Sequence, residues 1–375
     1  MNRTFGFEPK IGQALISHLG SATQIFRLSD EDITSLIGPH SRYKGKICRK
    51  AVDDAAKELS TLLGDGIQFC GVTEPHYPSL LKECEDAPIG IYIKSNTPIS
   101  ELWTSNRIAI VGTRDISPYG REWCTKIINS LAMTSERPAI VSGLALGVDI
   151  QAHKTAIDNN LPTIAVLPTG PDAIYPYRHR LQAEKIASSY GSALITDYPP
   201  GTAPLAIHFL RRNRIIAGLS TSTILIESKI KGGGMMTCRL AFSYNRDVYA
   251  LPGRIDDLRS QGCNELIRQK IAEPITSTTA LVESLSMKPA KDAHLGNTPL
   301  ILDGIYGRRT DAENIRQMES VISCIRHDRC ITIEEISETT GLSYSKAAEL
   351  TAILETDNII TIDLMQRCSI NPKFM

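Results

Sequence analysis

The sequence predicts an α/β protein built on a doubly wound, mainly parallel sheet, with a small helical domain before it and a winged-helix domain after it. Between residues 107 and 251, short β-rich runs alternate with stretches of helical periodicity. The runs are almost continuously apolar, which is typical of strands that a parallel sheet buries on both faces. The segments on either side are mostly helical and lack this alternation.

Length and composition bound the possibilities further. The chain has 375 residues, enough for two or three domains. Its 42% hydrophobic and 22% charged residues are those of an ordinary soluble globular protein. The formal net charge is zero, so no overall field indicates a nucleic acid or a membrane, and a site for a polyanion has to be a local patch.

Cysteine usage and hydropathy indicate a cytoplasmic protein without a metal site or a cofactor. The nine cysteines form no CxxC pair and no paired His/Cys spacing, which argues against zinc and against a disulfide framework. The N-terminus has no signal-peptide pattern, and no apolar run reaches the length of about 18 residues that a membrane helix needs.

Residues 1–64 are expected to form a helical domain, similar to SAM or helix-hairpin-helix modules. Apolar residues at helical spacing between Ile11 and Leu19 end at Gly20, and Ser29 precedes three acidic residues as a helix N-cap would. A longer helix is expected over residues 45–63. Such a module can contact a nucleic-acid backbone, but a cap packed on the next domain is the favoured role.

The sheet domain is expected over residues 65–285. Two strands at 67–72 and 89–93 precede the alternating region. Within that region strands are expected at 107–112, 139–141, 163–167, 193–196, 223–226 and 247–251, and helices at about 117–132, 148–158, 180–190, 205–219 and 236–245.

A linker at residues 286–312 and a winged-helix domain at 313–375 complete the chain. Thr332 and Glu335 form a capping box for the second helix of that domain, and residues 358–362 and 366–370 suggest a hairpin. Eleven acidic side chains stand against six lysines and arginines between residues 311 and 375. This balance disfavours a duplex-binding transcription regulator and favours protein contact or autoinhibitory packing.

The region from Arg211 to Thr237 indicates a site for a polyanion. Three arginines (Arg211, Arg212 and Arg214) open a helix, a buried strand follows, and three consecutive glycines come next. No acidic residue lies between Tyr198 and Ile226. Ligands of parallel α/β sheets bind outside the carboxyl ends of the strands, where such residues would gather. The alternative is a glycine-rich hairpin beside a solvated basic helix end.

Loops after other strands carry residues of the same kind. Gly112 and Arg114 follow the first buried strand, and Gly143 and Gly147 flank a loop that begins at Ser142. Tyr175 to Arg180 interleaves aromatic and basic residues, which suits single-stranded nucleic acid.

Several nearby polar residues are expected to be structural. Asp149 is expected to be a helix N-cap, and His153 to be a satisfied structural histidine. Asp149, Asp197 and Glu227 cap helices or pair with Arg212 and Arg214.

The candidate DNA-binding residues are Gly112, Arg114, Ser142, Gly143, Tyr175, Arg178, Arg211, Arg212, Asn213, Arg214, Gly233 and Thr237. No nucleophile–base–acid arrangement, GxSxG elbow or Walker A lysine is present, so we predict no catalytic residue and a binding protein that is not an enzyme.

The order of these motifs resembles the DNA-processing protein A family, known as DprA or Smf. The matching segments lie within residues 65–275 and include Ile110–Arg114, Val141–Asp149 with Ala152-His153, Arg212–Leu219 and Leu251–Gly253. The resemblance implies a Rossmann-like domain that binds single-stranded DNA, protects incoming strands in natural transformation and loads RecA onto them in recombination. It also implies a homodimer, and it makes Arg114, Gly143, Arg212, Asn213 and Arg214 the best candidates for the groove.

A rival interpretation is an enzyme. Nucleotide phosphoribohydrolases of the lysine-decarboxylase-like group share the Rossmann-like framework and resemble a Pro-Gly-Gly-x-Gly-Thr pattern followed by a catalytic glutamate. Here Lys231 precedes the glycines, and Arg239 stands where an acid is expected. The pattern therefore disfavours this interpretation.

Overall fold

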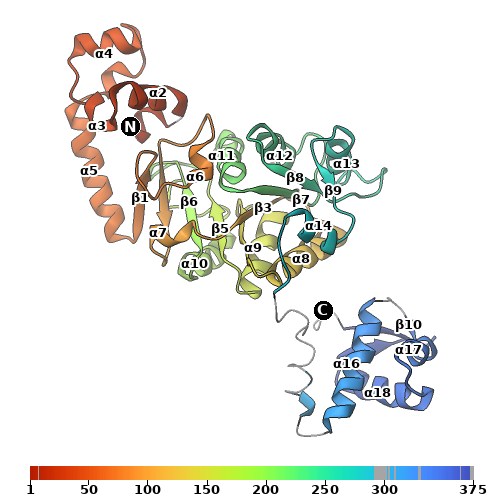
Figure 1. Cartoon of the computed structure of the whole chain (residues 1–375). Coiled ribbons are helices and arrows are strands. Elements are labelled where there is room, and N and C mark those ends of the chain that lie inside the picture. The colour runs from red at the N-terminus through yellow and green to blue at the C-terminus, as the bar shows by residue number, and fades with distance from the viewer. Residues whose placement is uncertain are drawn as a thin grey trace. The chain divides into compact units, whose positions relative to one another are not determined.

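The computed structural model describes residues 1–6, 8–290, 302, 305–307, 310–327, 331–363 and 365–371, apart from the side chains of residues 326 and 327. The chain divides into two compact units, residues 1–290 and 291–375 (Figure 1). Most of the expected linker at 286–312 lies outside the described residues, and the four-part domain division stays a prediction.

The first unit is organised around a nine-stranded sheet in the order β1-β2-β6-β5-β4-β3-β7-β8-β9. The strands from β6 to β9 in this order are parallel, whereas β1 and β2 are antiparallel to their neighbours. The strands are β1 (Ile67–Gly71), β2 (Gly90–Lys94), β3 (Arg107–Val111), β4 (Ala139–Ser142), β5 (Thr163–Val166), β6 (Ala193–Thr196), β7 (Ser222–Leu225), β8 (Asp247–Ala250) and β9 (Glu273–Pro274). The mainly parallel, doubly wound sheet is thus confirmed.

Helices cover both faces of this sheet, as alternating strands and helices require (Figure 1). One face carries α6 (Ser79–Lys82), α11 (Ala206–Leu219), α12 (Gly233–Ser243) and α13 (Gln261–Arg268). The other carries α8 (Pro118–Ala132), α9 (Val148–Asp158), α10 (Arg180–Ser188) and α14 (Thr278–Ser284). The short elements α7 (Ile99–Leu102) and η2 (Tyr177–His179) lie in connections.

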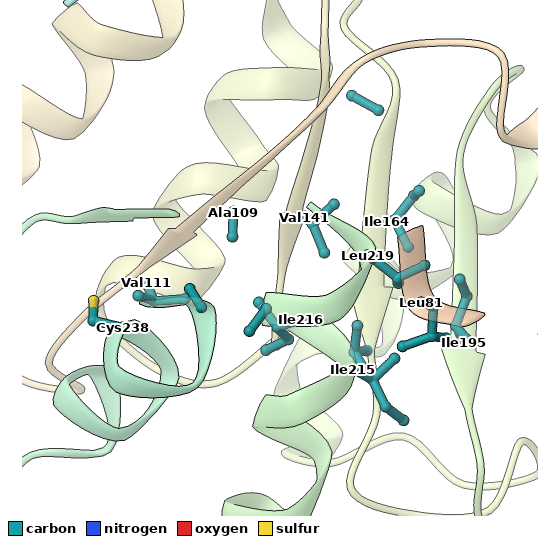
Figure 2. Packing of buried hydrophobic residues seen from close by; sticks show 14 of the residues in the cluster. Leu81, Ala109, Val111, Val141, Ile164, Ile195, Ile215, Ile216, Leu219 and Cys238 are labelled. Atoms are coloured by element: carbon teal, nitrogen blue, oxygen red, sulfur yellow. The ribbon is translucent and has the colours of Figure 1, made fainter. Parts of the chain in front are cut away.

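Successive residues of the central strand β3 point to opposite faces and join two separate cores. Ala109 and Val111 belong to the cluster under α11 and α12, and Ile108 and Ile110 to the cluster under α8 and α9. Figure 2 shows the first cluster, with residues of α11 packed over the strands. This packing fixes α11, and with it the side chains that α11 presents at its N-terminal end.

The N-terminal helices belong to the same compact unit as the sheet. They are α1 (Asn2–Phe5), α2 (Pro9–Leu19), α3 (Ala22–Ile25), α4 (Asp30–Ile37), η1 (Lys44–Lys46) and α5 (Arg49–Gly64). Gly20 ends α2 in the left-handed conformation, and Ser29 caps α4 with Asp32 in a capping box. The Asn2 side chain donates to the Asp197 carbonyl at 2.8 Å, so α1 is tied to the loop after β6.

The second unit includes the helices α16 to α18 and a three-stranded antiparallel sheet of order β10-β12-β11. Its elements are α16 (Ala312–His327), β10 (Ile331–Thr332), α17 (Ile333–Thr340), α18 (Tyr344–Thr356), β11 (Ile360–Ile362) and β12 (Arg367–Ile370). The expected capping box of Thr332 and Glu335 is present. The winged-helix assignment itself stays a prediction.

The described helices include none with the length and apolar character needed to cross a membrane.

Candidate nucleic-acid interface

A groove of about 640 Å³ lies at the carboxyl ends of β3 and β7. The chain lays down β3 to β6 in one direction across the sheet and then places β7 on the other side of β3. The loops after β3 and β7 therefore diverge, and ligands of doubly wound sheets bind at this switch point. The groove is lined by Val111, Gly112, Thr113, Arg114, Ala145, Asp149, Tyr175, Pro204, Ala206, Phe209, Leu210, Arg212, Asn213, Ser228, Lys229, Lys231, Gly232, Gly233, Gly234 and Thr237.

The loop after β3 is held close to its neighbours by backbone contacts. The Thr113 amide donates to the Glu227 carbonyl at 2.7 Å, and the Val148 amide donates to the Thr113 carbonyl at 3.1 Å. A Cβ on Gly112 would lie 2.6 Å from a Val148 methyl carbon. Gly147 has φ +77°, and a Cβ there would lie 2.2 Å from the Thr113 carbonyl oxygen. The two glycines thus let three chain segments meet at the groove.

One wall of the groove is an aromatic and cationic stack. The Arg114 guanidinium carbon lies 4.9 Å from the centre of the Phe209 ring. Tyr175 meets the same ring edge-on, with centroids 5.5 Å apart. Phe209 thus holds both side chains at the groove, through a cation–π contact on one side and an aromatic pair on the other.

The glycine loop after β7 forms the opposite wall and is itself the start of a helix. We expected the helix to begin near residue 236, but α12 begins at Gly233 with Gly232 as its N-cap. The absence of side chains lets this first turn approach the loop after β3, since a Cβ on Gly234 would lie 3.3 Å from the Gly112 Cα. The exposed Lys229 and Lys231 precede the turn. Unpaired amides of a helix N-terminus beside two lysines favour an anion.

Arg212 forms the floor of the groove. Its side chain is 5% exposed, and its guanidinium donates to the Gly143 carbonyl at 3.0 Å and to the Asp149 carboxylate at 3.4 Å. A Cβ on Gly143 would lie 1.7 Å from a guanidinium nitrogen of Arg212, so any larger residue here would displace the guanidinium. Burial lowers the pKa of Arg212 from its ordinary value, and the Asp149 carboxylate opposes that shift.

Three expectations around the floor need correction or refinement. Asp149 is not the N-cap of α9, which is Gly147. Instead the Asp149 carboxylate accepts from the Ala145 amide and from Arg212. Gly143 is needed for space, and the positive φ of this loop, +60°, occurs at the buried Leu144. His153 is fully buried and structural, with Nδ1 2.7 Å from the Thr163 hydroxyl, but its buried Nε2 has no hydrogen-bond partner in the described part of the chain, so it is only half satisfied. Burial lowers the pKa of His153 to about 3.

The structure brings seven of the twelve predicted residues to the groove and leaves five outside its lining. The seven are Gly112, Arg114, Tyr175, Arg212, Asn213, Gly233 and Thr237. Ser142 is buried and donates to the Ile110 carbonyl at 2.6 Å, and Gly143 lies beneath Arg212. Arg178 is exposed in η2.

Arg211 and Arg214 line a neighbouring hollow of about 410 Å³. Arg214 pairs there with the Asp197 carboxylate and donates to the Asp86 carbonyl. Of the two roles expected for the three carboxylates, Asp149 and Asp197 pair with Arg212 and Arg214. Contact of the twelve residues with DNA stays a prediction.

Sequence reasoning missed Phe209, Lys229 and Lys231. Phe209 lies in the acid-free segment just before the arginines, and the two lysines precede the glycine loop. Proximity to both motifs was an available signal. The sequence does not indicate on which face of α11 Phe209 lies.

The buried carboxylate nearest the glycine loop is occupied structurally. Glu227 accepts from the Ser117 amide at 2.9 Å and from the Ser117 hydroxyl, at the start of α8. No group of three His, Cys, Asp or Glu residues suited to a metal ion occurs in the described part of the chain.

Comparisons with known proteins agree on one family. A family model described as DNA recombination-mediator protein A matches residues 68–286. The DNA processing protein DprA of Streptococcus pneumoniae is 40% identical over 201 residues, which are 54% of this chain and 68% of that protein. Protein Smf of Synechocystis is 38% identical over 238 residues, 63% of this chain and 58% of that protein.

Two solved structures are similar over most of their length. The X-ray structure of DprA from Streptococcus pneumoniae has a TM-score of 0.64 and 33% identity, and covers 75% of this chain and 95% of that one. A structure of DNA processing protein A from Helicobacter pylori, described for its single-stranded DNA binding mode, has a TM-score of 0.52 and 30% identity. It covers 58% of this chain and 96% of that one.

Proposed function

This chain belongs to the DNA recombination-mediator protein A family, and on that premise we propose that its groove binds single-stranded DNA. The Helicobacter pylori relative, whose structure is described for its single-stranded DNA binding mode, supports the proposal. The observation that carries it is the union of an aromatic–arginine wall and a lysine–glycine wall in one groove.

The aromatic wall suits unpaired bases. The exposed Arg114 and Tyr175 are both held by Phe209, so a flat guanidinium and two rings lie within one short stretch of wall. Bases stack on aromatic rings and guanidinium planes whatever their identity, and a base within a duplex has no free face to offer. This wall therefore favours single strands and tolerates any sequence.

The opposite wall suits the phosphates. Lys229 and Lys231 are exposed, and the first turn of α12 adds backbone amides. Asp149 is the one acidic residue among the described residues that line the groove, and Arg212 is its partner. The groove therefore carries a net positive charge, although the formal net charge of the chain is zero.

Arg212 acts mainly by positioning. Its guanidinium contacts Gly143 and Asp149, so it joins the loop after β4 and the first turn of α9 to α11. Phe209 is on the same helix, one turn earlier. Arg212 thereby fixes the position of Phe209, and with it the positions of Arg114 and Tyr175, which contact the Phe209 ring.

The wider role follows from the family and is part of the proposal. We infer that the protein holds incoming single strands in natural transformation and recombination, that it passes them to RecA, and that it works as a homodimer. The family description as a recombination mediator supports this role. Holding rather than cleaving the strand fits the structural engagement of Glu227 by Ser117.

Fluorescence anisotropy with single-stranded and duplex oligonucleotides of equal length tests the central claim. We expect the single strand to bind more tightly, and Phe209→Leu, which keeps an apolar side chain but removes the ring, to weaken its binding by about tenfold. The matched control is Phe69→Leu, in a partly buried strand residue of β1. Equal affinity for both oligonucleotides, or unchanged binding by a folded Phe209→Leu protein, would contradict the proposal.

A further inference from the structure

A shallow apolar surface continues from the groove along α12. It forms a hollow of about 420 Å³ that shares Leu210, Lys231, Gly232 and Gly233 with the groove. In Figure 1, α11 and α12 lie side by side over the sheet. We call this surface the ledge, and its principal side chains are Leu210, Ile230, Lys231, Met236, Arg239 and Leu240.

The ledge exposes three large apolar side chains close together. Leu210 is 42% exposed, Ile230 is 52% exposed and Met236 is 41% exposed, although all three are large aliphatic side chains. Clustered apolar side chains at a surface mark a binding site more often than scattered ones do. Methionine in particular adapts its flexible side chain to flat partners of varied shape.

The charges of the ledge select the kind of partner. Lys231 and Arg239 stand at its border, and no acidic side chain occurs among the described residues that line it. The Arg239 guanidinium donates to the neutral amide oxygen of Gln269 at 2.9 Å, so its charge is not cancelled by that contact. Apolar side chains between two cations suit a ligand with flat apolar faces on an anionic backbone.

We propose that the ledge binds further bases of the strand that occupies the groove, and so lengthens the DNA footprint along α12. This inference rests on the proposed function. Continuity with the groove through Lys231 and the glycine turn carries it, together with the matching charge. Base faces contact Met236 and Ile230, and Arg239 pairs with a phosphate.

The test compares oligonucleotides of increasing length. For the wild-type protein, affinity for oligo-dT rises once the strand is long enough to pass from the groove onto the ledge. In the double variant Met236→Ser/Arg239→Ser, the shortest oligonucleotide that binds changes affinity by less than about twofold, while the longer ones lose about tenfold. The matched control is Leu63→Ser/Arg49→Ser, which changes exposed residues of the same two kinds on α5, away from the ledge, and should match wild type at every length.

A second arm separates bases from phosphates. Long oligonucleotides with abasic sugars outside the groove-binding segment keep every phosphate but offer no base to the ledge. The wild-type protein should bind them more weakly than intact strands, by severalfold, and the double variant should bind both equally.

Two results would overturn the inference. If the double variant keeps the full gain with length, the ledge does not bind DNA. If instead its self-association falls in light scattering while the gain with length is unchanged, the ledge is an interface between copies of the chain. A wild-type protein that binds no oligonucleotide of any length would remove the proposed function itself, which is a distinguishable outcome.

Discussion

The rim of the groove, by which we mean the exposed part of the aromatic wall, and the buried floor both use arginine, but for opposite purposes. Arg114 stands on the rim, exposed, and lies over an aromatic ring. Arg212 lies in the floor, buried, and its guanidinium contacts a carboxylate and a carbonyl. The difference lies in the neighbours, since a buried guanidinium needs a counter-charge and an exposed one does not. Arginine content alone therefore overstates how much of a basic motif is free to bind.

The sharpest way to break this comparison is to remove the counter-charge from the floor. Asp149→Ala leaves Arg212 buried without its carboxylate, so we expect the free energy of unfolding to fall by about 3–5 kcal/mol. Chemical denaturation measures it. Asp158→Ala, at an exposed position on the same helix, should change the value by less than about 0.5 kcal/mol. Equal effects of the two substitutions would mean that the Arg212–Asp149 pair contributes no more to the free energy of unfolding than an exposed aspartate does.

Acid should lower the stability of the fold through the buried His153 of α9, the helix that also carries Asp149. The pKa of His153 is about 3 in the folded protein, well below the ordinary value of 6.5, because the side chain is buried. Between pH 6.5 and pH 3, His153 is therefore protonated in the unfolded chain but neutral in the folded protein. The stabilisation is complete above pH 6.5 and declines by up to about 1.4 kcal/mol per pH unit as pH falls towards 3.

The substitution His153→Asn removes this titration while offering Thr163 a polar partner. Unfolding free energies between pH 7 and pH 4 should decline less steeply for this variant than for the wild-type protein. Parallel pH profiles would refute the assignment.

On the rim, Arg114→Ala should separate affinity from stability. We expect single-stranded DNA affinity to fall about tenfold, because a stacking surface for a base is lost. The slope of log affinity against log salt should shrink by no more than about 0.7, the value for one phosphate contact, since Arg114 lies on the wall assigned to bases. Stability should fall by no more than about 1 kcal/mol, the typical worth of an exposed cation–π contact. Arg49→Ala, at an exposed site on α5, serves as the control. A large loss of stability would mean that Arg114, like Arg212, has a structural role.

The smallest expected effect concerns Tyr175, which supports the stack from its edge. Removing its ring in Tyr175→Leu should weaken single-stranded DNA binding by about two- to tenfold, the range that an aromatic pair is worth. Phe209→Leu measured beside it should lose more. The reverse order would show that Tyr175, rather than Phe209, is the main stacking surface.

Local patterns predicted much of the architecture. The alternation of apolar runs and helices gave the strands from β3 to β8 within a few residues, and glycine and serine caps placed several helix ends. The antiparallel β1–β2 pair at the sheet edge was not foreseen, nor was the switch point between β3 and β7. Both depend on which strands pair across long stretches of sequence, and no local pattern encodes that.

The site was predictable in location more than in detail. Loops at strand carboxyl ends indicated the groove. Pairing with Arg212 and Arg214 was one of two roles expected for Asp149, Asp197 and Glu227, and the sequence did not indicate which carboxylate takes which role. The burial of Arg212 and the role of Phe209 were not, because both depend on how α11 is rotated about its axis over the sheet. A phenylalanine in a helix has the same sequence signature whether it faces the core or a ligand.

The two-residue strand β9 has a consequence for self-assembly. It ends the nine-stranded sheet with a glutamate and a proline, and proline has no amide hydrogen to offer a further strand. This border is thus poorly suited to recruiting another polypeptide by backbone pairing, which guards a concentrated protein against fibre-like stacking. Copies that meet at this border would have to recognise one another through side chains.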